Sequence, residues 1–153
     1  MTPARETYES CRPAPSRRVL VVDADLDASR TLAGLLTVWG YEAVVAYDGP
    51  AALAVAAADP RPAAALLDVK LPGMDVFELA RRLRGQPGLG RFLLVALARR
   101  GAEEVVRRCY AEVFDGHLFK GSGPEALRKA LAGVGPAART EARAPGAAIG
   151  LPA

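Results

Sequence analysis

The chain has 153 residues, of which 51% are hydrophobic and 24% charged, which suits one globular domain and is too short for two ordinary ones. Its formal net charge is only +3, and its few aromatic residues are not interleaved with the basic ones, which argues against a nucleic-acid partner. No apolar stretch is long enough to span a bilayer, and residues 1–16 lack the apolar core of a signal peptide, so we expect a cytoplasmic protein with no membrane partner.

The two ends of the chain differ in composition from its middle. Residues 1–16 are rich in proline, arginine and small polar residues, and residues 135–153 contain no periodic apolar face. Segments of this kind do not bury enough apolar surface to offset the entropy lost on ordering. We therefore expect flexible tails at 1–16 and 135–153 around one domain at 17–134.

The middle of the chain alternates short apolar runs with segments of helical periodicity. In chain order we first expect a strand at 19–22, a helix carrying Leu32, Leu35, Leu36 and Trp39 that ends at Gly40, and a strand at 43–46. There follow a helix beginning near Pro50, a strand at 63–67, a helix carrying Val76, Leu79, Ala80 and Leu83, and a strand at 93–97. The last elements are a helix at 103–111, a weaker strand at 117–119, and a helix carrying Leu127, Ala130, Leu131 and Val134. Ser122 and Glu125 have the spacing of a capping box before the last helix. Because the runs are apolar on both faces, the pattern predicts an α/β fold: an open, doubly wound parallel sheet of five strands with five helices.

Three charged residues stand at the ends of predicted strands: Asp23 after the first, Asp68 after the third and Lys120 after the fifth. Ligands of open parallel sheets bind beyond the carboxyl ends of the strands, so we expect these three side chains at one edge. The chain has three lysines against seventeen arginines, which argues against chance placement of Lys120. Two carboxylates and an ammonium group suit a divalent cation and a phosphoryl group. The alternative, that each residue only solvates a strand end, fits one such residue better than three.

Four segments carry a family resemblance: V-L-V-V-D at 19–23, A-Y-D-G at 46–49, L-L-D-V-K-L-P-G-M-D at 66–75 and D-G-H-L-F-K at 115–120. With them, the chain from about Arg17 to Val134 resembles the receiver domain of two-component response regulators. The resemblance implies a flavodoxin-like fold with strand order 2-1-3-4-5. It also implies a protein of phosphorelay signal transduction and not an enzyme.

The resemblance assigns a role to each residue of the expected site. In that family the acid after the third strand is the phosphoacceptor, which makes Asp68 the expected site of phosphorylation. Lys120 matches the lysine that pairs with the phosphoryl oxygens. Asp23 matches an acid that helps to hold Mg²⁺, which Asp68 and the backbone carbonyl of Lys70 would also contact. The resemblance therefore implies Mg²⁺ as cofactor and a histidine kinase or phosphotransfer protein as phosphoryl donor.

The sequence departs from the family pattern at positions that matter for this chemistry. The family's second acid after the first strand is replaced by Ala24, so we expect weakened Mg²⁺ binding unless Asp25 partly substitutes. Ala98 stands where the family has a threonine or serine whose hydroxyl turns toward the phosphoryl group. His117 occupies the place of the aromatic residue that moves with that hydroxyl, where histidine is a tolerated alternative. Ala98 and His117 are thus the expected switch positions.

These observations leave three functions. The first is a single-domain receiver that accepts a phosphoryl group on Asp68 and signals through protein–protein contact. The second is an atypical receiver, phosphorylated weakly or not at all, that acts as a protein-binding module. The third is a phosphatase of the haloacid dehalogenase type, because D-A-D-L-D at 23–27 resembles the D-x-D of those enzymes, although the acidic cluster that they carry after a late strand is missing near 114–122. We favour the first.

Overall fold

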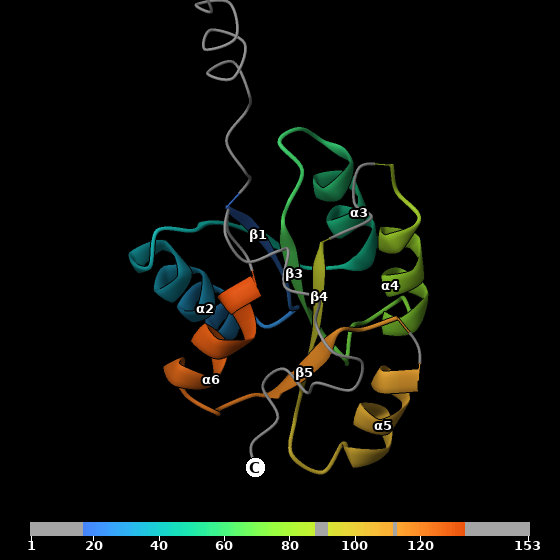
Figure 1. Cartoon of the computed structure of the whole chain (residues 1–153). Helices are drawn as coiled ribbons and strands as arrows, with labels where there is room; N and C mark the ends of the chain where they lie inside the picture. Colours follow the sequence, from blue (N-terminus) through green and yellow to red (C-terminus); the bar gives the residue numbers. More distant parts are fainter. Residues whose placement is uncertain (1–16, 88–91, 112, 134–153) are drawn as a thin grey trace, which may run out of the picture.

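Five parallel strands form one sheet in the part of the chain that the computed structural model describes, which is residues 17–87, 92–111 and 113–133. The strands are β1 (Arg18–Val22), β2 (Glu42–Ala46), β3 (Ala64–Asp68), β4 (Leu93–Ala98) and β5 (Gly116–Phe119). They pair in the order β2-β1-β3-β4-β5 (Figure 1). The predicted order is therefore confirmed, and each strand begins and ends within one residue of its predicted bounds. The expected tails at 1–16 and 135–153, and Val134, lie outside the described residues.

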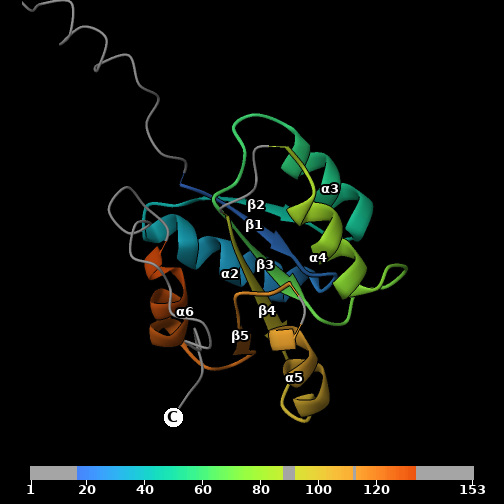
Figure 2. The same ribbon diagram turned by 45° about the vertical axis from the view of Figure 1, so that its right-hand side comes forward.

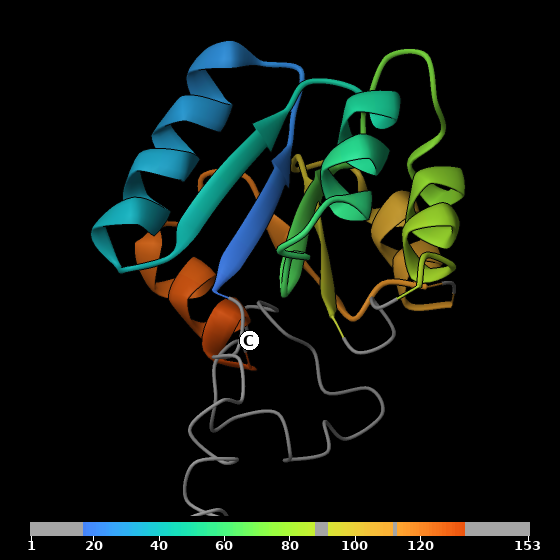
Figure 3. The same cartoon turned by 90° about the horizontal axis from the view of Figure 1, so that it is seen from above.

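Helices cover both faces of the sheet, as a doubly wound fold requires. On one face lie α2 (Leu26–Val38), α6 (Pro124–Ala130) and the short 3-10 helix η1 (Leu131–Gly133). On the other lie α3 (Gly49–Ala57), α4 (Val76–Arg84) and α5 (Glu103–Ala111), and the two layers are seen on opposite sides of the sheet in Figures 2 and 3. None of these described helices is long and apolar enough to cross a bilayer.

Alternation along each strand divides the core into two apolar layers. In β1, Val19 and Val21 belong to the cluster that includes Leu36 of α2, whereas Leu20 and Val22 belong to the cluster that includes Leu79 of α4. Successive side chains of a strand point to opposite faces, so a strand that is apolar throughout fills both layers. The strands β1, β3 and β4 are therefore largely buried on both faces, and the charged residues Asp23, Asp68 and Lys120 stand at the ends of strands.

Local signals fix where most of the helices begin and end. Gly40 has a positive φ of 92° directly after the last turn of α2, and Pro50 lies in the first turn of α3, both as the sequence predicts. The capping-box prediction at Ser122 is wrong. Gly123, with φ 97°, is the residue that precedes α6, no side chain caps this helix, and the Ser122 hydroxyl instead donates to the carbonyl of Phe119. The last helix also ends earlier than expected, at Ala130, where the chain tightens into η1.

A half-buried guanidinium joins three elements at the amino edge of the sheet. Arg84, at the end of α4, donates to the carbonyls of Phe92 (2.7 Å) and Val113 (3.1 Å) and to the Asp115 carboxylate (2.6 Å). The same carboxylate oxygen accepts from the backbone N–H of Leu94 at 2.8 Å. Arg84 thereby anchors α4 to the starts of β4 and β5, at the edge opposite the charged strand ends.

We predict that Arg84→Ala lowers the free energy of unfolding by about 2–3 kcal/mol, because it removes the donor to the carbonyl groups of Phe92 and Val113 and the charged partner of the Asp115 carboxylate. Urea unfolding followed by circular dichroism measures the change. Arg82→Ala is the matched control: Arg82 pairs with Glu78 on the exposed face of the same helix, and its loss should cost less than about 0.5 kcal/mol. Equal losses for the two variants would contradict this account of the Arg84 contacts.

Candidate functional site

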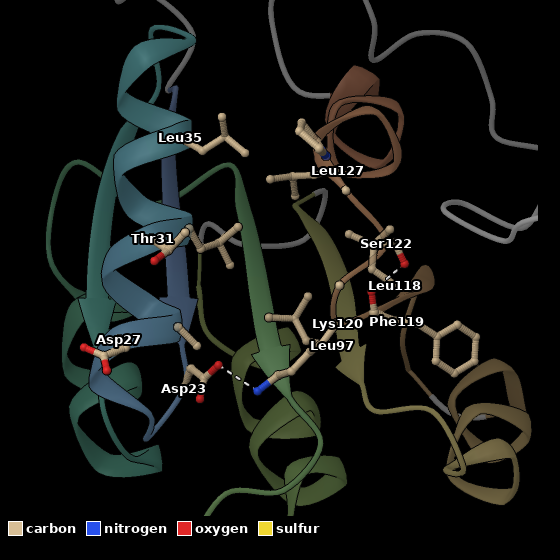
Figure 4. Close-up of a pocket in the computed structure, with 15 residues that line it drawn as sticks. Asp23, Asp27, Thr31, Leu35, Leu97, Leu118, Phe119, Lys120, Ser122 and Leu127 are labelled. Carbon is tan, nitrogen blue, oxygen red and sulfur yellow. Dashed lines mark hydrogen bonds and ion pairs between the residues drawn. The ribbon is translucent and has the colours of Figure 1, made fainter.

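Asp23, Asp68 and Lys120 meet at the carboxyl edge of the sheet, as predicted from their positions after the strands. The Lys120 ammonium group donates to Asp23 Oδ2 at 2.9 Å, drawn in Figure 4, and to Asp68 Oδ2 at 3.0 Å. Because β4 lies between β3 and β5, the long Lys120 side chain reaches past the end of β4 to make these contacts. One ammonium thus joins the ends of three strands.

Strand pairing holds the three residues at this edge. The backbone N–H of Asp23 donates to the carbonyl of Ala46 at 3.1 Å, and that of Lys120 donates to the carbonyl of Ala98 at 2.7 Å. Asp68 is itself the last residue of β3 and pairs in register with Leu97. The sheet ladder therefore continues into the site, and the side chains that leave it start from a rigid backbone.

Each carboxylate is also held by the loop that follows it. Oδ1 of Asp23 accepts from the backbone N–H of Asp25, and Oδ1 of Asp68 accepts from the backbone N–H of Lys70, both at 3.0 Å. Such contacts to a backbone N–H two residues on are the Asx-turns that aspartate favours. Each aspartate therefore gives one oxygen to its loop and the other to Lys120, which fixes the orientation of both carboxylates.

The two buried carboxylates respond differently to this environment. Burial alone raises the pKa of Asp23, but the hydrogen bonds from Lys120 and from the Asp25 backbone outweigh it and hold the pKa below its ordinary value. For Asp68, burial and the nearby charge of Asp23 outweigh the bonds from Lys70 and Lys120, so its pKa is raised. Burial lowers the pKa of Lys120, but the two carboxylates reverse this and raise it. Asp68 is thus the carboxylate whose negative charge is the more costly.

The residues that could complete a metal site are few. Ala24 is exposed and supplies no ligand, and Asp25 is the N-cap of α2, where its Oδ1 accepts from the backbone N–H groups of Asp27 and Ala28. The described residues contain no group of three or more His, Cys, Asp or Glu side chains arranged to hold a metal ion. One oxygen of Asp25 is therefore engaged in capping α2, which argues against Asp25 as a third ligand beside Asp23 and Asp68.

The two expected switch positions lie on the neighbouring strands β4 and β5. Ala98 is fully buried at the end of β4 and faces Phe119 in register. His117 is fully buried, and its ring packs edge-on to that of Phe119 with 5.1 Å between the centroids. Burial lowers the pKa of His117, which favours the neutral imidazole. The two expected switch positions are thus a methyl group and a buried imidazole.

Next to the site lies a pocket that the sequence did not predict. It has a volume of about 560 Å³ and lies between α2 and α6, with Asp23 and Lys120 in its lining (Figure 4). Helical spacing correctly predicts that Leu35 and Leu127 face inward, since both pack against the core. That spacing carries no signal for a hollow, because a hollow depends on how two helices distant in sequence fit together.

Comparison with known proteins identifies relatives of this chain. Residues 19–132 match the family model of the response regulator receiver domain. The chain is 47% identical over 90 residues to the response regulator PleD of Caulobacter vibrioides, covering 56% of this chain and 19% of PleD. It is 40% identical over 117 residues to the response regulator MprA of Mycobacterium tuberculosis, covering 76% of this chain and 48% of MprA. The chain thus spans about half of MprA and a smaller share of PleD.

Solved structures agree with this relationship. The chemotaxis protein CheY4 of Vibrio cholerae superposes with a TM-score of 0.71 at 30% identity, covering 79% of this chain and 99% of CheY4. The co-crystal structure of the Saccharomyces cerevisiae phosphotransfer protein Ypd1 with the receiver domain of Ssk1 also matches, with a TM-score of 0.68 at 21% identity, covering 81% of this chain and 92% of the matched chain. The second match concerns the fold alone.

The electrostatics of the site predict that Asp68→Asn raises the free energy of unfolding, by about 1 kcal/mol at neutral pH, because one of two carboxylates that share an ammonium loses its charge. A carboxyl with a raised pKa binds its proton more tightly in the folded state. It therefore destabilises the fold increasingly as pH rises from its ordinary pKa of 3.8 through the raised value. The stability difference between variant and wild type should grow over that window and level off above it.

Urea unfolding without Mg²⁺, repeated from about pH 4 to pH 8, measures this difference. Glu104→Gln is the control for loss of a carboxylate, because the Glu104 side chain is 85% exposed on α5. A stability difference for Asp68→Asn that is constant across the range, or that shrinks with rising pH, would contradict the raised pKa of Asp68.

Proposed function

The chain belongs to the response regulator receiver family, and on that basis we propose that it accepts a phosphoryl group on Asp68 and signals through protein–protein contact. The observation that carries this proposal is the Lys120 ammonium group, which lies 2.9 and 3.0 Å from oxygens of two buried carboxylates. In a receiver this group serves as the partner of the phosphoryl oxygens. Receiver domains are signalling modules of two-component systems, so the expected location is the cytoplasm and the expected activity is not that of an enzyme acting on a metabolite.

We propose a histidine kinase or a histidine phosphotransfer protein as the donor. An oxygen of the Asp68 carboxylate attacks phosphorus, the bond between phosphorus and the donor's imidazole nitrogen breaks, and that nitrogen keeps the bonding electron pair and takes up a proton. The product is an acyl phosphate on Asp68. The fold of the Ssk1 receiver, which was crystallised with Ypd1, is compatible with such a partner, and the downstream target is a protein of unknown identity.

The chain's own residues contribute position and charge to this transfer. The backbone N–H of Lys70 fixes one oxygen of Asp68, which leaves the other for attack. That second oxygen is held by Lys120, so the ammonium must move from the carboxylate to the incoming phosphoryl oxygens during transfer. Its positive charge then offsets negative charge where it develops, which is the main catalytic requirement of phosphoryl transfer.

The residues present fit Mg²⁺, but as a weak site. Asp23 and Asp68 offer hard oxygen ligands that point toward one another around Lys120, and the backbone carbonyl of Lys70 would be the third ligand. Bound Mg²⁺ would offset the repulsion between the carboxylates and the phosphoryl group. With Ala24 in place of an acid and Asp25 engaged in capping α2, water must supply the remaining ligands. We therefore propose that Mg²⁺ binds with reduced affinity.

A second function, that of an atypical receiver that binds partners largely independently of phosphate, is favoured by one observation. Ala98 offers no hydroxyl to the phosphoryl group, and His117 is fully buried on the neighbouring strand β5. Without that hydroxyl, phosphorylation of Asp68 has no direct contact through which to move the residue at 117. The two functions differ in whether Asp68 takes up phosphate efficiently, or only weakly or not at all.

Incubation with acetyl phosphate and Mg²⁺ followed by mass spectrometry distinguishes these functions. We predict one added phosphoryl group, on Asp68, and its complete loss in Asp68→Asn. Asp75→Asn is a suitable control, because Asp75 lies between β3 and α4, as the N-cap of α4, and its carboxylate accepts from the backbone N–H of Glu78. Absence of label in the wild-type chain at high Mg²⁺ would favour the second function, and label on Asp23 would contradict the assignment of Asp68.

We further predict that Ala24→Asp tightens Mg²⁺ binding about fivefold or more, since it adds one carboxylate near the ion, and speeds labelling of Asp68. Calorimetry is a more suitable measurement than tryptophan fluorescence. Trp39 lies at the end of α2 that is far from Asp23, and the Arg128 guanidinium lies over its ring. Asp25→Ala should change Mg²⁺ affinity less while lowering stability by about 1 kcal/mol through loss of the N-cap. Unchanged affinity in Ala24→Asp would mean that another group already completes the site.

A further inference from the structure

Met74 packs the loop that follows Asp68 against the first turn of α3. This β3–α4 loop comprises residues 69–75, and α3 and α4 lie side by side on one face of the sheet (Figures 1 and 2). The Met74 Sδ lies only 2.5 Å from where a Cβ on Gly49 would stand, and the Met74 Cβ lies 3.2 Å from that point. The sulfur therefore occupies space that exists only because residue 49 is a glycine.

Met74 also stands between two hydrogen bonds that shape the β3–α4 loop. Before it in the chain, the backbone N–H of Lys70 donates to the Asp68 carboxylate at 3.0 Å. Directly after it, Asp75 caps α4 by accepting from the backbone N–H of Glu78. The Met74 side chain packs against the apolar layer between the sheet and this pair of helices. A displacement of Met74 would therefore be transmitted along the loop to the N–H group that fixes one oxygen of Asp68.

The Met74 thioether is accessible to oxidants. Its side chain is only half-buried, and its chain neighbours Gly73 and Asp75 are exposed. With hydrogen peroxide, a lone pair of the sulfur forms the S–O bond and the O–O bond breaks. The hydroxide that is released takes the proton of the transferred oxygen and leaves as water. The sulfur is thereby oxidised to the sulfoxide and the peroxide is reduced.

We propose that Met74 is a site of reversible oxidation, and that its sulfoxide releases the β3–α4 loop from α3. A sulfoxide is a strong dipole, which costs free energy when it is packed against apolar side chains. The oxidised side chain therefore turns toward water, and the contact between Met74 and Gly49 is lost. Methionine sulfoxide reductases remove the added oxygen with thiols as the reductant, so the release is reversible.

The consequence for Asp68 rests on the proposed function. In the reduced chain the loop holds the Lys70 N–H against one oxygen of Asp68. In the oxidised chain this bond is less well held, so the carboxylate that attacks phosphorus is less well oriented. Labelling of Asp68 by acetyl phosphate should then slow at least about threefold. Met74 is thus a positioning residue, because it acts through the backbone of Lys70 and does not touch the phosphoryl group.

The test treats the full chain with hydrogen peroxide and then with dithiothreitol, which reduces disulfides and sulfenic acids at Cys11 and Cys109 but leaves a sulfoxide in place. Peptide mass spectrometry should find one added oxygen on Met74. Backbone amide NMR should show shifts at Gly49 and Lys70 that a methionine sulfoxide reductase reverses. Absence of the oxygen on Met74, or its presence without these shifts, would overturn the proposal.

Two substitutions of Met74 separate oxidation from other effects of peroxide. Met74→Leu keeps an apolar side chain of similar size but has no sulfur, so it should label like the untreated wild type both before and after peroxide. Met74→Gln places a polar group at the same position and should label slowly without peroxide. An equal loss of labelling in peroxide-treated wild type and Met74→Leu would contradict the role of Met74. Absence of labelling in the untreated chain would count against the proposed function, whereas the amide shifts would still decide whether oxidation releases the loop.

Gly49→Ala tests the same contact from α3. The added Cβ should push the Met74 sulfur outward, so Met74 should oxidise at least about twofold faster than in wild type, because susceptibility follows exposure. Gly34→Ala is the matched control, since a Cβ on this residue of α2 would meet no described atom within 4 Å, and its oxidation rate should equal that of wild type. Circular dichroism checks that each variant is folded. Equal oxidation rates in the two glycine variants would show that Met74 is not held against Gly49 and would refute the proposal.

Discussion

A single ammonium group shared by two buried carboxylates sets the chemistry at the carboxyl edge of this sheet. Asp23 and Asp68 are only 2% and 4% exposed, and carboxylates so far from water need a counter-ion to stay charged. Lys120 supplies it only because β1, β3 and β5 are parallel and end at the same level, which lets one flexible side chain reach past β4. The helices that bury both faces of the sheet hold the strands in that register. The fold therefore sets the distance from the end of β5 to the ends of β1 and β3, and that distance lets Lys120 contact both carboxylates.

Sharing one cation does not make the two carboxylates equivalent. The pKa of Asp23 is lowered and that of Asp68 is raised, although each accepts one bond from Lys120 and one from a backbone N–H. The difference arises because burial weighs more heavily on Asp68 and the charge of Asp23 adds to it. Asp23 is thus the more permanent anion, suited to holding a cation. Asp68 is the carboxylate whose negative charge is the less favourable in the folded protein. This accords with its proposed role as phosphoacceptor.

The site keeps the residues that bind charge but departs from the family pattern at the two positions expected to transmit a signal. Lys120 and the two carboxylates, which bind charge, are present and in contact, whereas Ala98 and the enclosed His117 do not offer the hydroxyl–aromatic pair of the family. Lys120 also lines the pocket between α2 and α6, in addition to contacting the two carboxylates. A change in its contacts at Asp68 would alter one end of that pocket. This gives the chain a connection from the site to α2 and α6 that does not pass through residue 98.

Sequence by itself determined the strands and the three residues at the sheet edge, because these depend on local patterns: apolar runs, helical spacing, and charged residues directly after strands. The strand order followed from the family resemblance of the sequence. Sequence also determined the turn at Gly40, where a positive φ requires glycine. It misplaced the start of the last helix, because Ser122 has the composition of a cap but Gly123 has the backbone freedom that this turn uses. Only the tertiary structure decided that Lys120 contacts both carboxylates, that the pKa values of Asp23 and Asp68 diverge, that Asp25 caps a helix, and that α2 and α6 leave a pocket between them. Each of these depends on distances between segments far apart in the chain, and on the water that those segments exclude, which no local pattern of residues encodes.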